Sequence, residues 1–454
     1  MPYIPHTDND AKYILKAVGA GSIDELLSAL PAALRVKGRL DLPGSLSEQE
    51  LKVLLKDLSS RNVTVGEYSS FLGAGAYNHY IPSIVDSLIS RSEFYTSYTP
   101  YQPEISQGTL QAIFEYQTLV CQLTSMDVAN ASLYDGASAV AEAVLMARRI
   151  TGKDGIILSA ALHPEYRETV KTYLVGAGNH ISEALYCTDA GTTLPEALER
   201  SLSDDTACVV VQHPNFFGSL EDLGSLSEAV HRKKALLIAV ITEPVSLGLL
   251  KPPGALGCDI VVGENQSFGN PLSYGGPYLG FLATKTEFVR QMPGRLVGQT
   301  VDKNGNRAFC LTFSTREQHI RRERATSNIC TNHGLCALAA SIHMASLGEA
   351  GLRKLARLNF SKAEYLKEKL KGIGVPLAFK TQTFNEFTIR LDKDPEPVLK
   401  ALLKKKIIGG LALNRFYPEL KGHILITATE MNSKKEMDAF TDALSGILVP
   451  AVAK

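Results

Sequence analysis

The sequence lacks an excess of charge of either sign. Its 454 residues include 47 Lys and Arg against 47 Asp and Glu, so the formal net charge is zero. Nucleic acids and anionic membranes attract proteins chiefly through an excess of basic side chains. The basic clusters at 321–324 and 404–406 are interpreted as solvated helix faces. We therefore expect neither a nucleic-acid nor a membrane partner.

Paired cysteines are also lacking. The seven cysteines are an odd number, and no two of them form a Cys-x-x-Cys pair. This usage is typical of a reducing compartment, so we expect the cytoplasm. Cys330, His333 and Cys336 lie close together in sequence, but no second ligand pair accompanies them. The spacing favours helix packing, and we expect no metal site.

The sequence is also interpreted as lacking long apolar runs and a targeting segment. No apolar stretch is judged long enough to span a membrane. The start, MPYIPHTDNDAKYIL, has neither the basic region nor the apolar region of a secretory signal. Its early acidic residues argue against an organelle transit peptide.

Short apolar runs alternate with amphipathic segments through the middle of the chain. Several of these runs are apolar throughout, which indicates strands covered on both faces, as in a mostly parallel sheet. The candidate strands are GIILS (155–159), ACVVVQ (207–212), ALLIAVIT (235–242), DIVVG (259–263) and YLGFLAT (278–284). Repeated β–α units of this kind predict a doubly wound α/β domain.

Helical patterns dominate both ends of the chain. Residues 1–65 predict a helical arm, in which Thr7 and Asp10 are spaced like a capping box, as are Ser22 and Glu25. Residues 66–325 hold the large α/β domain, and residues 326–454 hold a linker helix and a smaller α+β domain. This order resembles the aminotransferase-like class of enzymes that depend on pyridoxal phosphate (PLP), known as fold type I.

A PLP site needs a lysine, an acid for the pyridine nitrogen, a phosphate-binding helix start and a side chain on the ring face. Asp135, Gly136, Ala137 and Ser138 open a helix with small residues, which suits phosphate or simply a tight turn. Glu243 follows the strand where the acid is expected.

The lysine is missing. Asn265, Gln266 and Ser267 stand where it is expected, and amides cannot form a Schiff base. Lys251 and Lys285 are the nearest lysines, and neither is well placed in sequence to replace it.

Four stretches carry a specific resemblance. They are YSSFLGAGAYNHYIP (68–82), FYTSYTPYQPEISQG (94–108), KPPGALGCDIVVGENQSFGNPLSYGGPYLGF (251–281) and RERATSNICTN (322–332). The sequence resembles, through nearly its whole length, the first (alpha) subunit of the two-subunit form of P-protein. P-protein is the decarboxylating glycine dehydrogenase of the glycine cleavage system.

The resemblance implies a function shared between chains. P-protein uses PLP to remove the carboxylate of glycine as CO₂, and it passes the aminomethyl group to the lipoyl arm of H-protein. T-protein and L-protein complete the system. In the two-subunit form the second (beta) subunit carries the PLP lysine, and in one-chain forms the C-terminal half carries it within a segment like NLHKTF. Phe268 matches the phenylalanine of that segment, so Gln266 stands at the lysine position. The implied assembly is an α₂β₂ heterotetramer in which the partner, and not this chain, binds PLP covalently. This chain alone is expected to be inactive.

A proline-stiffened aromatic segment is the strongest candidate for a wall of the partner's site. It contributes Tyr95, Tyr98, Tyr101, Gln102 and Glu104. Proline restricts the backbone, so such side chains are held in one geometry. The alternative is a structural loop with ordinary aromatic packing.

Two further residues are candidates for the same site. His79 suits proton transfer or a carboxylate contact, although a satisfied structural histidine is as good an interpretation. Arg316 suits a phosphate or carboxylate contact, but a surface salt bridge explains it better.

Two functional alternatives also stay open. One is a noncatalytic scaffold or regulatory protein of PLP-fold ancestry, and the other is an independent PLP lyase that uses Lys251 or Lys285.

Overall fold

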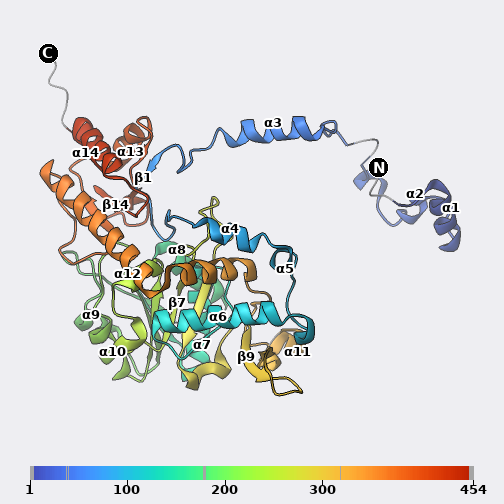
Figure 1. Ribbon diagram of the computed structural model, residues 1–454, viewed down its shortest axis with the longest axis horizontal. Coiled ribbons are helices and arrows are strands. Elements are labelled where there is room, and N and C mark those ends of the chain that lie inside the picture. Colours follow the sequence, from blue (N-terminus) through green and yellow to red (C-terminus); the bar gives the residue numbers. More distant parts are fainter. Residues whose placement is uncertain (1–4, 37, 39, 177–179, 317, 449–454) are drawn as a thin grey trace, which may run out of the picture. The chain divides into compact units, whose positions relative to one another are not determined.

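The computed structural model describes residues 5–36, 38, 40–176, 180–316 and 318–448. The chain divides into two units, Met1–Val63 and Thr64–Lys454 (Figure 1). The first unit contains α1 (Asp8–Ala17), α2 (Ile23–Leu26) and α3 (Glu48–Ser59). Thr7 and Asp10 form the predicted capping box. At Ser22 the hydroxyl accepts from the Glu25 N–H, but the Glu25 carboxylate accepts from Gly21 instead of closing the box.

A mostly parallel sheet forms the centre of the second unit. Its strands are β2 (Val128–Ala129), β3 (Gly155–Ser159), β4 (His180–Ala184), β5 (Thr206–Gln212), β6 (Leu236–Ile241), β7 (Ile260–Glu264) and β8 (Gly280–Thr284). The order across the sheet is β2-β8-β7-β6-β5-β3-β4. Strands β3 to β7 pair in parallel, whereas β8 runs antiparallel to β7 and to β2. The prediction of a mostly parallel sheet is confirmed.

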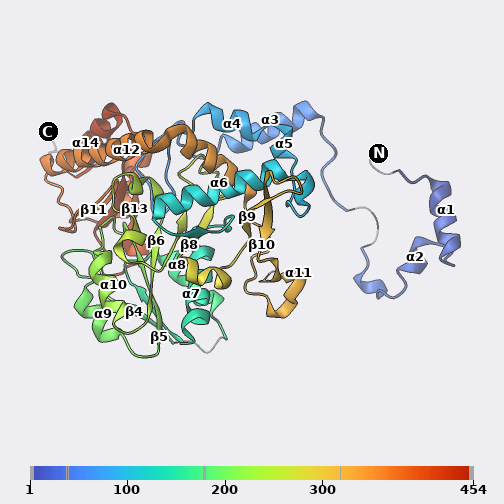
Figure 2. The same cartoon turned by 60° about the horizontal axis from the view of Figure 1, so that its bottom comes forward.

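Helices cover both faces of this sheet, as Figures 1 and 2 show. The helices are α6 (Gln107–Thr124), α7 (Gly136–Thr151), α8 (Pro164–Tyr173), α9 (Pro195–Ser201), α10 (Leu223–His231) and α12 (Gly334–Gly372). Along β5, Val209 and Val211 pack with α6, α10 and α12, and the alternating Cys208 and Val210 pack with α7 and α8. This alternation explains why the strands are apolar throughout, because each face has its own core.

A smaller group of elements follows the sheet in sequence. It contains β11 (Glu386–Arg390), α13 (Pro395–Leu403), β12 (Ile407–Ile408), β13 (Leu411–Ala412), β14 (His423–Thr427) and α14 (Lys434–Leu448). β11, β14 and β13 form an antiparallel sheet whose core includes the C-terminal part of α12. The early strand β1 (Ser69–Ser70) pairs in parallel with β12. The division at residue 325 stays a prediction.

Three helices and two strands complete the outline around the large sheet. They are α4 (Ser83–Ile89), α5 (Ser92–Tyr95), the antiparallel pair β9 (Leu296–Val301) and β10 (Arg307–Thr312), and α11 (Gln318–Arg321). α4 packs against α12, so the chain between β1 and α6 crosses the surface of the sheet domain near that helix.

Helix α12 corrects one expectation from the sequence. Among the described residues it is long and apolar enough, by length and composition alone, to cross a membrane. The statement that no stretch is long enough is therefore wrong on that test. Ala337, Ala340 and Met344 of this helix pack into the core, and the backbone leaves helical geometry at Gly348 (φ 58°, ψ −177°). Its apolar composition therefore has an explanation in packing against the sheet domain.

Candidate functional site

The turn after β7 contains the residue at the predicted lysine position. Gln266 is only 2% exposed. Its Oε1 accepts from the Tyr77 N–H at 2.9 Å, and its Nε2 donates to the Tyr77 carbonyl at 3.1 Å and to the Asn270 carbonyl at 2.7 Å. The side-chain amide thus pairs with both backbone groups of Tyr77. Gln266 fixes the loop that approaches from β1.

His79 of that loop is held between two carboxylates. Its Nε2 lies 2.8 Å from Glu243 Oε2, and its Nδ1 lies 2.8 Å from Glu430 Oε2. Burial alone lowers the pKa of His79, but the two carboxylates, Glu243 foremost, raise it to about 10. Burial raises the pKa of Glu430, and the contacts with His79 outweigh this and bring it to about 2. Both ring nitrogens of His79 are therefore engaged by carboxylates that favour its protonated form, an arrangement that favours the structural interpretation of this residue.

Other buried polar groups secure the same loop. Glu386 on β11 accepts from the Ala74 N–H at 2.7 Å and from the Tyr77 hydroxyl at 3.0 Å. Burial raises the pKa of Glu386 to about 7. The Thr429 hydroxyl donates to the Asn78 carbonyl, and the Tyr80 N–H donates to Glu430 at 2.6 Å. Residues 74–80 are thus tied both to the large sheet and to the group around β11 and β14.

The predicted phosphate-binding residues do open a helix. Asp135 and Ser138 form a capping box at the start of α7, where the Asp135 carboxylate accepts from the Ser138 N–H at 2.7 Å. The Gly136 N–H donates to the carboxylate of Glu264 at 3.0 Å. Glu264 ends β7 and also accepts from the N–H groups of Gln266 at 3.1 Å and Leu279 at 2.7 Å. Burial raises the pKa of Glu264 to about 7.

A cavity of about 380 Å³ adjoins this helix start. It is lined partly by residues 74–76, Asp135, Ala137, Glu264 and Tyr278. His163 also lines it, and sequence reasoning missed this residue. The His163 ring caps α8, reaches the Ala74 carbonyl at 2.9 Å and stacks on Tyr166 with the ring centroids 4.7 Å apart. The signal that could have found it is a His-Pro pair at a helix start just after a strand.

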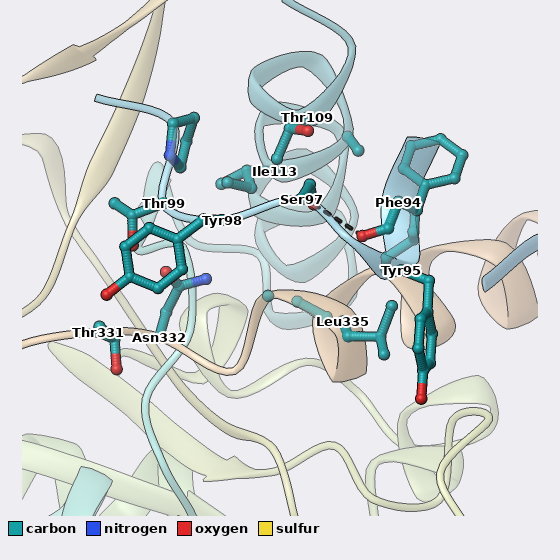
Figure 3. A pocket seen from close by; sticks show the side chains of 15 residues that line it. Phe94, Tyr95, Ser97, Tyr98, Thr99, Thr109, Ile113, Thr331, Asn332 and Leu335 are labelled. Carbon is teal, nitrogen blue, oxygen red and sulfur yellow. Dashed lines mark hydrogen bonds between the residues drawn. The ribbon is translucent and has the colours of Figure 1, made fainter. Parts of the chain in front are cut away.

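The predicted aromatic wall is largely exposed. Tyr95 is 67% and Tyr98 80% exposed, and both line a second cavity of about 260 Å³ (Figure 3). Figure 3 also shows lining residues from other elements. They are Thr109 and Ile113 of α6, Thr331 and Asn332 just before α12, and Leu335 of α12. Segments distant in sequence, 94–100 and 331–338, therefore form one hollow.

The other members of the predicted wall differ among themselves. Tyr101 accepts a hydrogen bond from Arg295 at 2.8 Å, and the guanidinium also lies over its ring. Gln102 and Glu104 are exposed beside the short 3-10 helix Pro103–Ile105. The backbone of Arg316 lies in the 3-10 helix Ser314–Arg316, but its side chain lies outside the described residues.

The structure thus brings the predicted site residues together only in part. Asn332 lines the cavity at the aromatic segment with Tyr98, and the next residue, His333, lines the cavity at α7. The two hollows therefore meet the chain at consecutive residues. His79 of the same loop lines neither hollow and is buried. Within the described part of the chain, no three His, Cys, Asp or Glu side chains are grouped to hold a metal ion.

Comparison with known proteins decides the family. The pattern of the family described as Glycine cleavage system P-protein matches residues 1–444. A probable glycine dehydrogenase (decarboxylating) subunit 1 of Desulfitobacterium hafniense is 52% identical over 448 residues, which cover 98% of this chain and 100% of that protein. The chain belongs to the P-protein family. A probable subunit 1 of Geobacillus kaustophilus is 50% identical over 97% of this chain and 98% of that protein.

Solved structures place this P-protein chain in its fold class. It matches a crystal structure of glycine decarboxylase (P-protein) in inhibitor-bound form with a TM-score of 0.88 and 43% identity, covering 99% of this chain and 100% of that one. A glutamate decarboxylase of Lactobacillus brevis matches with a TM-score of 0.68 and 13% identity, over 92% of this chain and 95% of that one. The last likeness concerns the fold alone. The predicted fold type I of PLP-dependent enzymes is confirmed.

The residues of this P-protein chain do not fit a covalently bound PLP. The side chain at the lysine position is an amide with both of its polar atoms hydrogen-bonded. Lys285 lies 2.5 Å from Asp259, which precedes β7, so it stands at the opposite edge of the sheet from Gln266. Lys251 is exposed before a 3-10 helix, Pro253–Leu256. An independent lyase built on either lysine has no support in this geometry.

Proposed function

We propose that this chain is the subunit of a two-subunit P-protein that binds no PLP covalently and completes the active site of a lysine-bearing partner. The assembled enzyme decarboxylates glycine and passes the aminomethyl group to the lipoyl arm of H-protein, in a system that includes T-protein and L-protein. The observation that carries the proposal is the contrast between its two regions. Gln266 at the predicted lysine position is buried and hydrogen-bonded, whereas Tyr95 and Tyr98 of the aromatic segment are exposed to solvent.

The open segment suits a surface that another protein covers. Tyrosine offers a large apolar ring and a polar hydroxyl at little cost in conformational entropy, and it is enriched where binding energy is concentrated at interfaces. Tyr98 would gain most from such burial because 80% of it is exposed in this chain. PLP held by the partner would supply the electron sink for decarboxylation. The role of this chain's residues is to exclude water and to present hydroxyl groups to the glycine carboxylate.

We further propose that two copies of each subunit assemble as an α₂β₂ heterotetramer in the cytoplasm. All seven cysteines are free thiols in the structure, which suits a reducing compartment. The names of the subunit 1 relatives support the existence of a second subunit.

The proposal is tested by exchange of labelled CO₂ into the glycine carboxylate. The chain alone, the lysine-bearing subunit alone and their mixture are each assayed with H-protein. We expect exchange in the mixture and none with this chain alone. Full exchange by the lysine-bearing subunit without this chain would make the chain a scaffold or regulator and would overturn the proposal.

The wall assignment is tested in the same mixture. We expect Tyr95→Ala and Tyr98→Ala to lower exchange about tenfold or more, or to weaken assembly equivalently, because about 1.4 kcal/mol of lost interaction corresponds to tenfold. Leu185→Ala is the control, because Leu185 is 72% exposed and lies after β4, outside both cavities. If all three variants were equally active, neither tyrosine would belong to the active site.

A further inference from the structure

The start of α7 has the properties of an anion-binding site. A helix N-terminus presents unpaired N–H groups and the positive end of the helix dipole, which together favour a phosphate or carboxylate. α7 has sixteen residues and begins with the small residues Gly136 and Ala137. In this chain, however, the N–H groups of Gly136 and Ser138 already donate to carboxylates of the same chain.

Glu264 is the carboxylate that matters here. It is 1% exposed and accepts three backbone hydrogen bonds, from the turn at Gln266, from Leu279 before β8 and from Gly136 at the helix start. A buried carboxylate is tolerated only when its oxygens are satisfied in this way. Glu264 therefore joins the turn after β7, the segment before β8 and the start of α7.

Close packing also limits the space directly beside Gly136, although a cavity adjoins the helix start. A Cβ atom added at Gly136 would lie 2.4 Å from the Tyr166 hydroxyl, so this ring already packs against the first residue of the helix. Gly280 is equally confined, because an added Cβ would lie 2.3 Å from the Asp135 carbonyl oxygen.

We infer that Glu264 is an internal anion that takes the place of a phosphate group at the start of α7 and excludes phosphate-bearing cofactors from this chain. The exclusion has two physical parts. The Glu264 carboxylate occupies the Gly136 N–H, and in its ionised form it would repel a phosphate brought beside it in a buried, weakly screened setting. Loss of the lysine is thus one of two separate barriers to PLP. Because Glu264 also accepts from the Gln266 N–H, both barriers lie in one turn after β7.

The inference stands independently of the proposed half-site role, since it concerns this chain alone. It predicts a latent anion site that a single substitution uncovers. The first experiment measures the thermal unfolding midpoint of the full chain with inorganic phosphate, against chloride at equal ionic strength. We expect no specific phosphate effect on the natural chain and a rise of several degrees for Glu264→Ala, because a ligand that binds only the folded state stabilises it.

Glu264→Gln tests the charge of the side chain apart from its size. It also serves as the test if Glu264→Ala does not fold. It keeps the size of the side chain and removes the charge, so we expect a smaller phosphate effect of the same sign. If every folded variant responds to phosphate as the natural chain does, Glu264 is not an internal anion and the inference is overturned.

The second experiment restores the amine. Gln266→Lys and the double variant Gln266→Lys/Glu264→Ala are incubated with PLP or with phosphate-free pyridoxal, reduced with borohydride, and the label at residue 266 is quantified by peptide mapping. We expect PLP to have no advantage over pyridoxal in the single variant and about a tenfold advantage in the double variant, the ratio that about 1.4 kcal/mol provides. Equal and strong PLP labelling of both variants would contradict the inference.

Discussion

At the scale of one residue, His79 is held by two carboxylates from distant parts of the chain. Its imidazole lies between Glu243, which follows β6, and Glu430, which follows β14. Glu243 is the residue that the sequence places at the pyridine-nitrogen position, and in the structure its carboxylate is engaged by His79 and by Asn385 at 3.1 Å. The carboxylate at the predicted pyridine-nitrogen position therefore belongs to a side-chain network within this chain.

This network predicts a pH-dependent stability. The folded pKa of His79, about 10, exceeds its ordinary value of 6.5, so the protonated ring stabilises the fold fully below pH 6.5. That contribution is lost as the pH rises through about 10. Removing one partner of a buried ion pair costs about 3–5 kcal/mol. We expect His79→Gln to lower the thermal unfolding midpoint strongly at neutral pH and progressively less toward pH 10.

The control for this prediction is His6→Gln, because His6 is exposed. It should leave the unfolding midpoint unchanged across the range. A His79→Gln deficit that is constant from neutral pH to above the folded pKa would show that His79 does not carry the charge described above.

Gln266 gives a second prediction for a single residue. Gln266→Met keeps the size of the side chain but removes its hydrogen bonds to Tyr77 and Asn270. Buried backbone groups left without partners cost about 1–3 kcal/mol each. We expect a clear fall in the denaturant midpoint. Gln111→Met in α6, where the half-buried Gln111 side chain donates to Glu115, should change the free energy of unfolding by less than about 0.5 kcal/mol. Equal midpoints for both variants would rule out the clamp on Tyr77.

At the scale of elements, the close approach of β8 to the start of α7 fixes the helix position. An added Cβ at Gly280 would lie 2.3 Å from the Asp135 carbonyl oxygen, and backbone cannot yield as a flexible side chain can. We expect Gly280→Ala to lower the thermal unfolding midpoint by several degrees, in line with the cost of overpacking, about 1–3 kcal/mol. Gly108→Ala is the matched control, since a Cβ there would meet nothing within 4 Å. A neutral Gly280→Ala would mean that α7 shifts freely.

The elements also show what the sequence could and could not predict. The runs 155–159 and 207–212 were recognisable as buried strands because both faces are covered, and they correspond to β3 and β5. β4 was missed because four of its five residues are not buried, so it has no apolar run. The strand pair β9–β10 was missed although Asn304 and Gly305 form a recognisable turn signal between its strands.

At the scale of the whole molecule, the site was predictable where it depends on local sequence and unpredictable where it depends on distant partners. The place of Gln266 follows from its position after a strand and from the resemblance to P-protein. The pairing of His79 with Glu430 joins residues that are 351 positions apart in the sequence, and neither segment has a pattern that predicts this contact. The sequence predicted that residues 135–138 begin a helix. The hydrogen bond from the first N–H of that helix to Glu264 could be seen only in the structure.

The whole-molecule account divides the enzyme into a chain that holds PLP and this chain, which walls the site. The most direct test is to reconstitute the two subunits with PLP and glycine, reduce the mixture with borohydride, separate the chains and locate the pyridoxyl label by mass spectrometry. The account predicts stoichiometric label on a lysine of the partner and none at Lys251, Lys285 or any other single lysine of this chain. Stoichiometric label on one lysine of this chain would contradict it.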